Sequence, residues 1–132
     1  MITELNFKTS KKQELIDITH EIEMILRKVS IDEGICYVYT PHATCSLIIN
    51  ENADPNMKED ILKAINKLVP MKNNYLHDKI DDNAHSHIKS AILGCSVSVP
   101  VKHGHLMLGR WQSILLCDFD GPRTRKVIIT IK

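Results

Sequence analysis

The sequence predicts an α+β fold with a mixed, mostly antiparallel, sandwich-like β-sheet, two main helices and one short helix. Strand-like segments outnumber helical ones, in the order β-α-β-β-α-(α)-β-β-β-β, and the last four follow one another at hairpin spacing. The chain has 132 residues, of which 43% are hydrophobic. Such a chain can build one core, so we expect a single domain spanning residues 1–132.

The first segment alternates polar and apolar side chains over residues 2–8, which is typical of an edge strand. Ser10, followed three residues later by Gln13, has the pattern of a capping box. Apolar residues then recur at helical spacing, at Leu15, Ile18, Ile22, Ile25, Leu26 and Val29. This pattern predicts an amphipathic helix over residues 10–28.

Two β-branched segments, 35–40 and 44–50, predict strands on either side of Pro41. Asp54 and Pro55 then have the residue types of a helix N-cap and first helical position. The helix that follows is expected to bury a stripe formed by Met57, Ile61, Ala64, Ile65 and Leu68.

The remaining segments begin with a polar loop over residues 71–82. A short helix over 83–93 ends at Gly94, with an expected core stripe of Ala84, Ile88, Ala91 and Ile92. Four strands are then predicted from the apolar runs CSVSVPV, HLMLG, WQSILLCDF and KVIITI.

Composition excludes several classes of protein. The 17 basic and 16 acidic residues nearly cancel, which argues against nucleic-acid binding. No apolar run approaches the ~20 residues of a membrane span, and the first residues, MITELNF, lack a signal pattern. The cysteines stand singly in apolar runs, which is typical of buried free thiols in a reducing compartment. We therefore expect a cytoplasmic protein.

The segment around His42 has the first group of candidate site residues. If the strand is regular, Ala43, Cys45, Leu47 and Ile49 form a core face, and the opposite face has His42, Thr44, Ser46, Ile48 and Asn50. Buried polar groups need partners, so this face indicates a ligand, water or a second subunit. Alternatively, His42 caps the strand end and the hydroxyls bond across the ladder. Asp54 is fully explained as a helix cap.

Glu51 lies between a strand and a helix start. A carboxylate there can handle a proton or a metal, while the helix N-terminus holds a phosphate. The alternative is a solvated loop residue.

Residues 76–87 contain three histidines and three aspartates, a ligand set suited to zinc or a similar divalent ion. On a straight helix, His85 and His87 lie on opposite flanks of the expected core stripe, about 160° apart. One metal ion cannot easily bind both. Asn83 and His87 share a flank, and His77 in the loop is free to join them, so His85 is expected to be a bystander.

Two further segments offer polar candidates. In the GRWQ segment, packing is the favoured role of Trp111, whereas Gln112 among apolar neighbours needs a hydrogen-bond partner. Arg123 and Arg125 follow a tight turn and suit a phosphate or carboxylate, or simply a solvated turn.

Taken together, these segments resemble the YjbQ-like family, also called the secondary thiamine-phosphate synthase family. The resemblance rests on TPHATCSLIINENADP, HDxxxDxxxxHIKSAILG, SVSVPVxxGxxxxGRWQSI and FDGPR, and covers nearly the whole chain. It implies an α+β fold, a ring-like homotrimer with a pocket near the subunit contacts, and functional roles at His42, Asn50, Glu51, His77, Asp82, His87, Trp111 and Gln112. Arg110 occupies a position where Thr also occurs in the family.

The resemblance implies an enzyme that joins a pyrimidine pyrophosphate to a thiazole phosphate with metal-assisted loss of pyrophosphate. We assign catalytic roles to His42, Asn50, Glu51 and Gln112, and substrate binding to Thr44, Ser46, Arg110, Trp111 and Arg123. The expected cofactor is a divalent ion, Zn or Mg, held by His77, Asp82 and His87; ligation by His42, His77 and His87, or by Glu51 and Asp82, stays open. The alternative is a trimer that binds a metal or small ligand without turnover.

Overall fold

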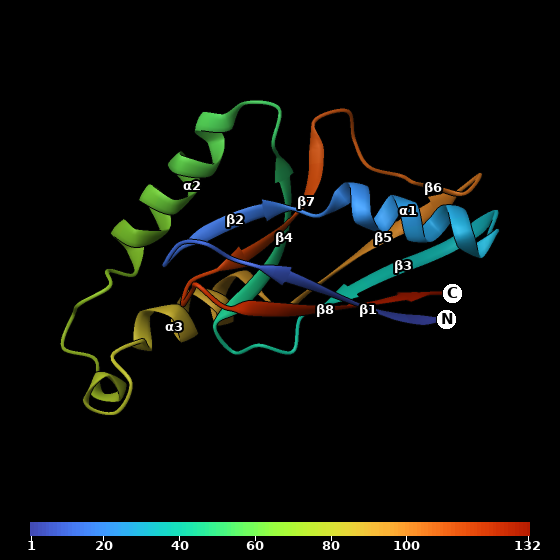
Figure 1. Ribbon diagram of the computed structural model, residues 1–132. Coiled ribbons are helices and arrows are strands. Elements are labelled where there is room, and N and C mark those ends of the chain that lie inside the picture. Colours follow the sequence, from blue (N-terminus) through green and yellow to red (C-terminus); the bar gives the residue numbers. More distant parts are fainter.

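The computed structural model describes all 132 residues and contains two antiparallel sheets. The larger sheet has the strand order β1 (Ile2–Lys8), β8 (Thr124–Ile131), β3 (Glu33–Tyr39), β5 (Ser96–Lys102) and β6 (His105–Leu106). The smaller sheet has the order β2 (Glu14–Asp17), β7 (Gln112–Asp118) and β4 (Cys45–Glu51). The predicted α+β class is confirmed, because every strand pair is antiparallel and helices flank the sheets (Figure 1).

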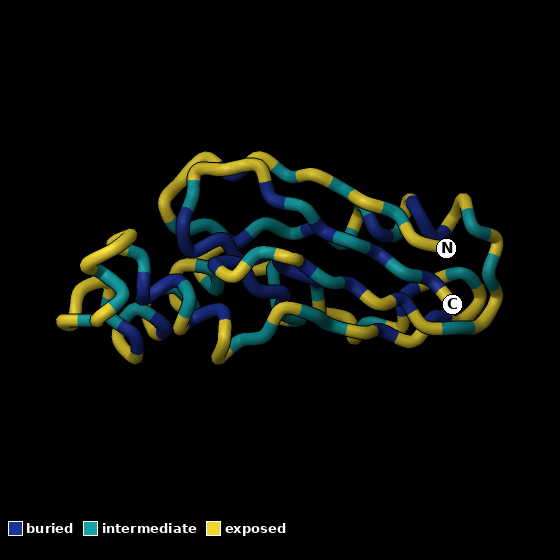
Figure 2. Tube along the Cα trace, turned by 90° about the horizontal axis from the view of Figure 1, so that it is seen from below, coloured by how far each residue is buried: buried dark blue, intermediate teal, exposed yellow.

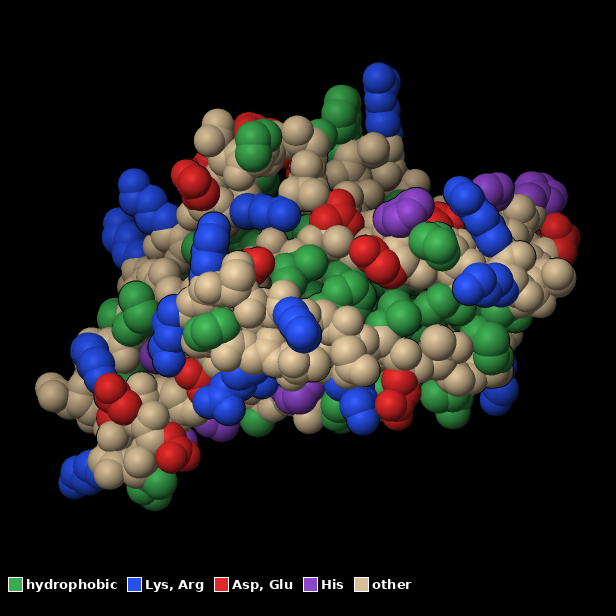
Figure 3. Space-filling view, in the orientation of Figure 1, with side chains coloured by type: hydrophobic (Ala, Val, Ile, Leu, Met, Phe, Trp, Pro, Cys, Tyr) green, Lys and Arg blue, Asp and Glu red, His purple; other side chains and the backbone are tan.

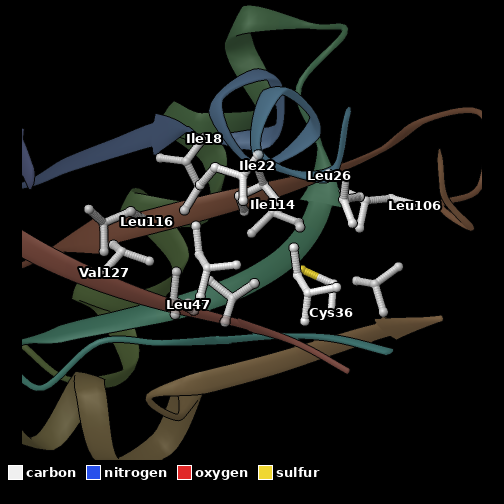
Figure 4. Close-up of a cluster of buried hydrophobic side chains, with 14 of the residues drawn as sticks. Ile18, Ile22, Leu26, Cys36, Leu47, Leu106, Ile114, Leu116 and Val127 are labelled. Atoms are coloured by element: carbon white, nitrogen blue, oxygen red, sulfur yellow. The ribbon is translucent and has the colours of Figure 1, made fainter. Parts of the chain in front are cut away.

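The main core lies between the two sheets. Helix α1 (Thr19–Val29) contributes Ile22 and Leu26, which meet Leu47 of β4, Ile114 of β7 and Val127 of β8 there (Figure 4). A second, smaller core lies on the other face of β7, between the smaller sheet and the helices α2 (Pro55–Leu68) and α3 (Ala84–Leu93). Exposed and half-buried residues alternate along β1, and buried and half-buried residues alternate along β8, whereas most of β7 is buried on both faces (Figure 2).

The prediction of a helix over residues 10–28 is wrong at its N-terminal end. Glu14 accepts hydrogen bonds from the backbone N–H and hydroxyl of Ser10 and from the N–H of Lys11, which fixes a turn instead of a capping box. Leu15 and Ile16 then contact the two different cores, so this segment is a strand buried on both faces. Helix α1 begins only at Thr19, whose N–H and hydroxyl both donate to Asp17.

Helix α2 begins where the sequence predicts, since Asp54 accepts a hydrogen bond from the N–H of Asn56. Its expected apolar stripe is correct in part: Ile65 is buried and Ile61 packs against the second core, whereas Ala64 is exposed and Leu68 is 76% exposed. Helix α2 stands at one side of the molecule, beyond the smaller sheet (Figure 1).

Helix α3 ends at Gly94 as predicted, with φ of 92°. The expected stripe is wrong except for Ala84, because Ile88 and Ile92 are exposed and the buried face is polar: His85, Ser86, Lys89 and Ser90. The helical period was right, but the polar side of the helix faces the protein.

The last four strands exist, but only β5 and β6 form a hairpin. β7 crosses to the smaller sheet between β2 and β4, and β8 returns to the larger sheet between β1 and β3. A short 3-10 helix, η1 (Leu76–Lys79), lies within residues 71–82, which the sequence predicts as a loop. None of the helices is long and apolar enough to cross a membrane.

Candidate functional site: a polar cleft at one end of the smaller sheet

A cleft of about 620 Å³ lies where β4 begins and β7 ends, at the paired residues Cys45 and Asp118. Four separate loops and the first turn of α3 meet there. Its lining is polar and charged apart from Pro41 and Ala43, and we call it the polar cleft: Lys12, Pro41, His42, Ala43, Thr44, Asp81, Asn83, His87, Asp120, Arg123 and Arg125. His42, Thr44, His87 and Arg123 are the predicted site residues that the structure brings together here.

The floor of the cleft is a buried ion pair between Arg125 and Asp118. Nη2 of Arg125 lies 2.8 Å from Oδ1 of Asp118 and donates also to the Thr44 hydroxyl at 2.8 Å. The hydroxyl of Thr9 donates to the other oxygen of Asp118 at 2.7 Å. Segments that are far apart in the sequence are therefore held at a single carboxylate.

Arg125 keeps donors free for a ligand. All its hydrogen bonds within the chain come from Nη2, and buried Nε has no partner. Burial alone would lower the pKa of Arg125, but the hydrogen bond to Asp118 outweighs it and raises the pKa, so the guanidinium stays charged. Nη1 is thus a charged donor without a partner in the lining of the polar cleft.

Asp120 forms the second charged group of the cleft. It accepts hydrogen bonds from Lys12 Nζ at 2.7 Å and from the Asn83 amide at 2.9 Å, and Arg123 Nη2 lies 3.5 Å away. Burial would raise its pKa, but the hydrogen bonds from Lys12 and Asn83 outweigh that effect and the pKa is lowered. Asp120 therefore remains a carboxylate that holds two cations at the cleft rim.

His42 has a fixed tautomer. Its Nε2 accepts the backbone N–H of Lys126 at 2.9 Å, so Nε2 is unprotonated and the proton sits on Nδ1. Burial lowers the pKa of His42, and the nearby charge of Arg125 lowers it further, which keeps the ring neutral. Nδ1 makes no bond within the chain, so His42 offers one N–H to a ligand.

The predicted metal ligands come together only in part. The rings of His77 and His87 meet edge to face, with centroids 4.9 Å apart, and His77 Nε2 has no hydrogen-bond partner. Asp82 lies outside the cleft and pairs with Lys72. No group of three or more His, Cys, Asp or Glu side chains is arranged to hold a metal ion. The implied zinc or magnesium ion therefore does not fit the ligand positions within one chain.

The other predicted residues lie at the far end of the same two strands. Glu51 is opposite Gln112, and six residue steps along β4 separate it from Cys45 at the cleft, which is about 20 Å. Gln112 is exposed and accepts the N–H of Gly109, and Asn50 accepts the N–H of Glu51. Within one chain, this end does not meet the polar cleft.

The aromatic packing that the sequence favours for Trp111 is not met within the chain either. Trp111 is 58% exposed, and the guanidinium of Arg110 stacks on its ring at 5.0 Å. Ser46 differs again, since it is fully buried and its hydroxyl has no partner. Its strand face is covered by the second core, as the alternation along β4 predicts for a residue two positions from Ile48.

His85 lies outside the polar cleft and belongs to a buried polar network. It is buried, and its Nδ1 lies 2.7 Å from the amino group of Lys89, which is itself fully buried. Lys89 also donates to Asn66 of α2 at 2.6 Å and to Gln13 at 3.1 Å. No carboxylate is close enough to form an ion pair with Lys89, and burial lowers the pKa of Lys89 to about 8.

The sequence analysis does not single out Lys12 or Asp120 of the cleft, or Asp118 beneath its floor. The predicted helix over residues 10–28 hides the position of Lys12. Asp118, Asp120 and Arg125, on the two sides of the Gly121-Pro122 turn, are a usable signal for a charged strand end.

Comparison with known proteins identifies the family. Residues 3–132 match the family model described as UPF0047 protein YjbQ-like. A UPF0047 protein of Archaeoglobus fulgidus is 51% identical, covering 96% of this chain and 97% of its own, and UPF0047 protein YugU of Bacillus subtilis is 43% identical, covering 98% and 97%. The crystal structure of a YbjQ-like protein of unknown function from Sulfolobus solfataricus has a TM-score of 0.96 and 36% identity, covering 99% and 95%. The chain therefore belongs to the YjbQ-like UPF0047 family.

Proposed function

We propose that the polar cleft binds a phosphorylated small molecule and that the protein is a transferase that displaces pyrophosphate from it. The observation that carries this proposal is the set of free donors in the cleft. Arg125 Nη1 and His42 Nδ1 have no partners in the chain, and Lys12 and Arg123 lie at the rim. Guanidinium, ammonium and imidazole N–H groups are the side chains that bind phosphate oxygens.

The reaction that suits this cleft is the one implied by the family resemblance. The ring nitrogen of a thiazole phosphate forms a bond to the exocyclic carbon of a pyrimidine pyrophosphate, and the bond from that carbon to the pyrophosphate oxygen breaks. The electron pair leaves with pyrophosphate, and the thiazole nitrogen takes up the positive charge. Arg125, Lys12 and the Nδ1–H of His42 stabilise the charge that develops on the leaving oxygens.

His87 lines the polar cleft and gives a proton to the departing pyrophosphate oxygen, because His42 Nε2 is occupied by the backbone N–H of Lys126. The chain does not supply three converging metal ligands, so protein groups alone meet the charge on the leaving oxygens.

We also propose a homotrimer in the cytoplasm. The four cysteines are free, in keeping with a reducing compartment. The outer face of the larger sheet is uncovered and exposes apolar side chains, with Ile35 55% and Tyr37 43% exposed. Such a face on a small protein indicates a protein contact.

The test measures product formation from the pyrimidine pyrophosphate and the thiazole phosphate, with and without EDTA. Lys12→Ala, His42→Ala and His87→Ala are each expected to lower kcat by about ten- to a thousandfold, the range for losing one charge-stabilising or proton-transferring group. The control is His103→Ala, an exposed histidine on the β5–β6 turn, which should leave kcat unchanged.

Three results would contradict the proposal. Unchanged turnover in His42→Ala and His87→Ala would remove these residues from the chemistry. Loss of turnover with EDTA, restored by zinc or magnesium, would return the metal to the mechanism. Binding of pyrophosphate that depends on Lys12, without any product, would instead support a binding trimer with no turnover.

A further inference from the structure

A second hollow of about 350 Å³ adjoins the polar cleft. The two share His42, Ala43 and His87 in their walls, and we call the second hollow the annex. Its remaining lining comes from the start of β4 and the C-terminal half of α3: Cys45, Ser90, Ala91, Gly94 and Cys95. The cleft and the annex are thus two compartments of different chemistry on either side of two imidazole rings.

The annex has no formal charge of its own. Its lining has small side chains, Ala43, Ala91 and Gly94, which leave room for a flat group. The two histidine rings at the boundary offer faces or edges for stacking. Apart from the shared His42, the annex adds no donor of positive charge for a phosphate, whereas its small side chains leave space for a ring.

One polar group in the annex lacks a partner. Ser90 is 6% exposed, and its buried hydroxyl makes no hydrogen bond in the chain. Leaving a buried hydroxyl unpaired costs stability, so a ligand that bonds it would remove that penalty. A ring nitrogen or an amino group is suited to this, because the hydroxyl both donates and accepts.

We propose that the annex binds the ring of the phosphorylated substrate, and that this ring is a small nitrogen heterocycle recognised by Ser90. The phosphate lies in the polar cleft and the ring lies in the annex, with His42 and His87 at the junction. This inference rests on the proposed function, because it assumes that the polar cleft holds the phosphate.

Cys95 lines the annex and can report whether a ligand occupies it. Cys95 is the only exposed cysteine, and Cys36, Cys45 and Cys117 are buried. Burial raises the pKa of those three thiols to about 11, about 12 and about 12, so a thiol reagent at neutral pH reacts with Cys95. A ring in the annex would cover Cys95, but a ligand confined to the cleft would not.

The experiment titrates three probes by calorimetry: inorganic phosphate, phenyl phosphate and the pyrimidine pyrophosphate whose leaving group the polar cleft is proposed to hold. Ala91→Phe fills the annex from an exposed helix position and is expected to weaken both ring-bearing probes by about ten- to a hundredfold, the effect of losing the burial of a ring. Inorganic phosphate should bind as in the wild type. Ala64→Phe, at an exposed alanine of α2 that lines neither hollow, is the matched control and should change nothing.

Ser90→Ala tests the recognised atom. It should weaken the binding of the pyrimidine pyrophosphate by about three- to tenfold, the effect of one hydrogen bond, and leave the binding of phenyl phosphate unchanged. In parallel, the pyrimidine pyrophosphate should slow the reaction of Cys95 with a thiol reagent, and inorganic phosphate should not.

The outcomes separate the two proposals. If inorganic phosphate binds through Lys12 but the binding of the ring-bearing probes is insensitive to Ala91→Phe, the annex proposal is overturned and the cleft proposal stands. Failure of every probe to bind would overturn both. A Cys95 that does not react in the free protein would also overturn the annex, because the hollow would then be closed.

Discussion

At the scale of single residues, one hydrogen bond from the backbone determines which nitrogen of His42 is protonated. The N–H of Lys126 occupies Nε2 of His42, so His42 acts as a neutral donor and not as a base. The sequence places a histidine beside a strand, but the tautomer depends on a partner 84 residues away. No pattern within a short window contains that information.

Lys89 is the residue whose environment departs furthest from expectation. Its pKa lies near 8 in the folded protein, against 10.5 in an unfolded chain. Between these values the unfolded state binds more protons than the native state, so the free energy of unfolding rises with pH across this window. Below pH 8 the native state has to bury a charged amine.

The prediction concerns this window. Wild-type protein should gain at most about 3 kcal/mol of stability between pH 8 and 10.5 relative to Lys89→Met, which has nothing to titrate there. Denaturant unfolding at a series of pH values measures the difference. Lys63→Met, at an exposed position of α2, is the control and should run parallel to the wild type; a parallel profile for Lys89→Met would refute the prediction.

At the scale of elements, α2 and α3 show where the hydrophobic period misleads. The sequence predicts the start of α2 correctly because capping is local: Asp54 bonds the N–H of Asn56 two residues later. The predicted buried face of α3 is wrong except at Ala84, because the polar network around Lys89 faces the protein and attaches α3 to Asn66 of α2. A helical wheel ranks polar residues as solvent-facing and cannot anticipate such a network.

Because α2 buries only Ile65, it should be among the first elements to open. Asp54→Ala removes the N-cap, which is worth about 1 kcal/mol, so amide hydrogens of α2 should exchange about fivefold faster. Hydrogen exchange read by mass spectrometry should show no change in α1. Asp60→Ala, exposed within α2 and outside the cap, is the control; an equal effect from both variants would mean that capping is not the cause.

Strand assignments succeeded more often than strand connections. The segments of β1, β3, β4, β5, β7 and β8 follow from alternation and β-branched content. The crossing of β7 into the smaller sheet does not, since both β7 and β8 have nearly continuous apolar runs that suit either sheet. The sequence does not predict β2, because its two apolar residues, Leu15 and Ile16, pack against different cores and also fit a helical period.

At the scale of the whole molecule, the apolar surface is unevenly distributed. Hydrophobic side chains gather along the front of the molecule between α1 and β1, where the two sheets do not pair (Figure 3). Together with the uncovered outer face of the larger sheet, this supports the proposed assembly. The proposed assembly also matters for the residues around Glu51 and Gln112, because they lie too far from the polar cleft of their own chain to act there.

The assembly is testable by light scattering on a sizing column. The wild type should have three times the chain mass of 15.0 kDa. Tyr37→Glu places a charge on the outer sheet face and should shift the mass toward one chain, because burying an unpaired carboxylate is costly. Met24→Glu, at a similarly exposed apolar position on α1, is the control; a monomeric wild type, or dissociation by Met24→Glu alone, would refute this interface.

The ion pair of Asp118 and Arg125 has a consequence for how such a cleft changes over evolutionary time. Arg125 serves the ligand site and the fold at once, so replacing it would leave Asp118 charged, buried and unpaired. Lys12 and Arg123 are exposed at the rim, and their loss threatens little besides binding. We therefore expect relatives to keep Asp118 and Arg125 on the floor of the cleft and to differ at Lys12 and Arg123 on its rim. Relatives would then acquire new ligands by exchanging rim residues above a constant floor.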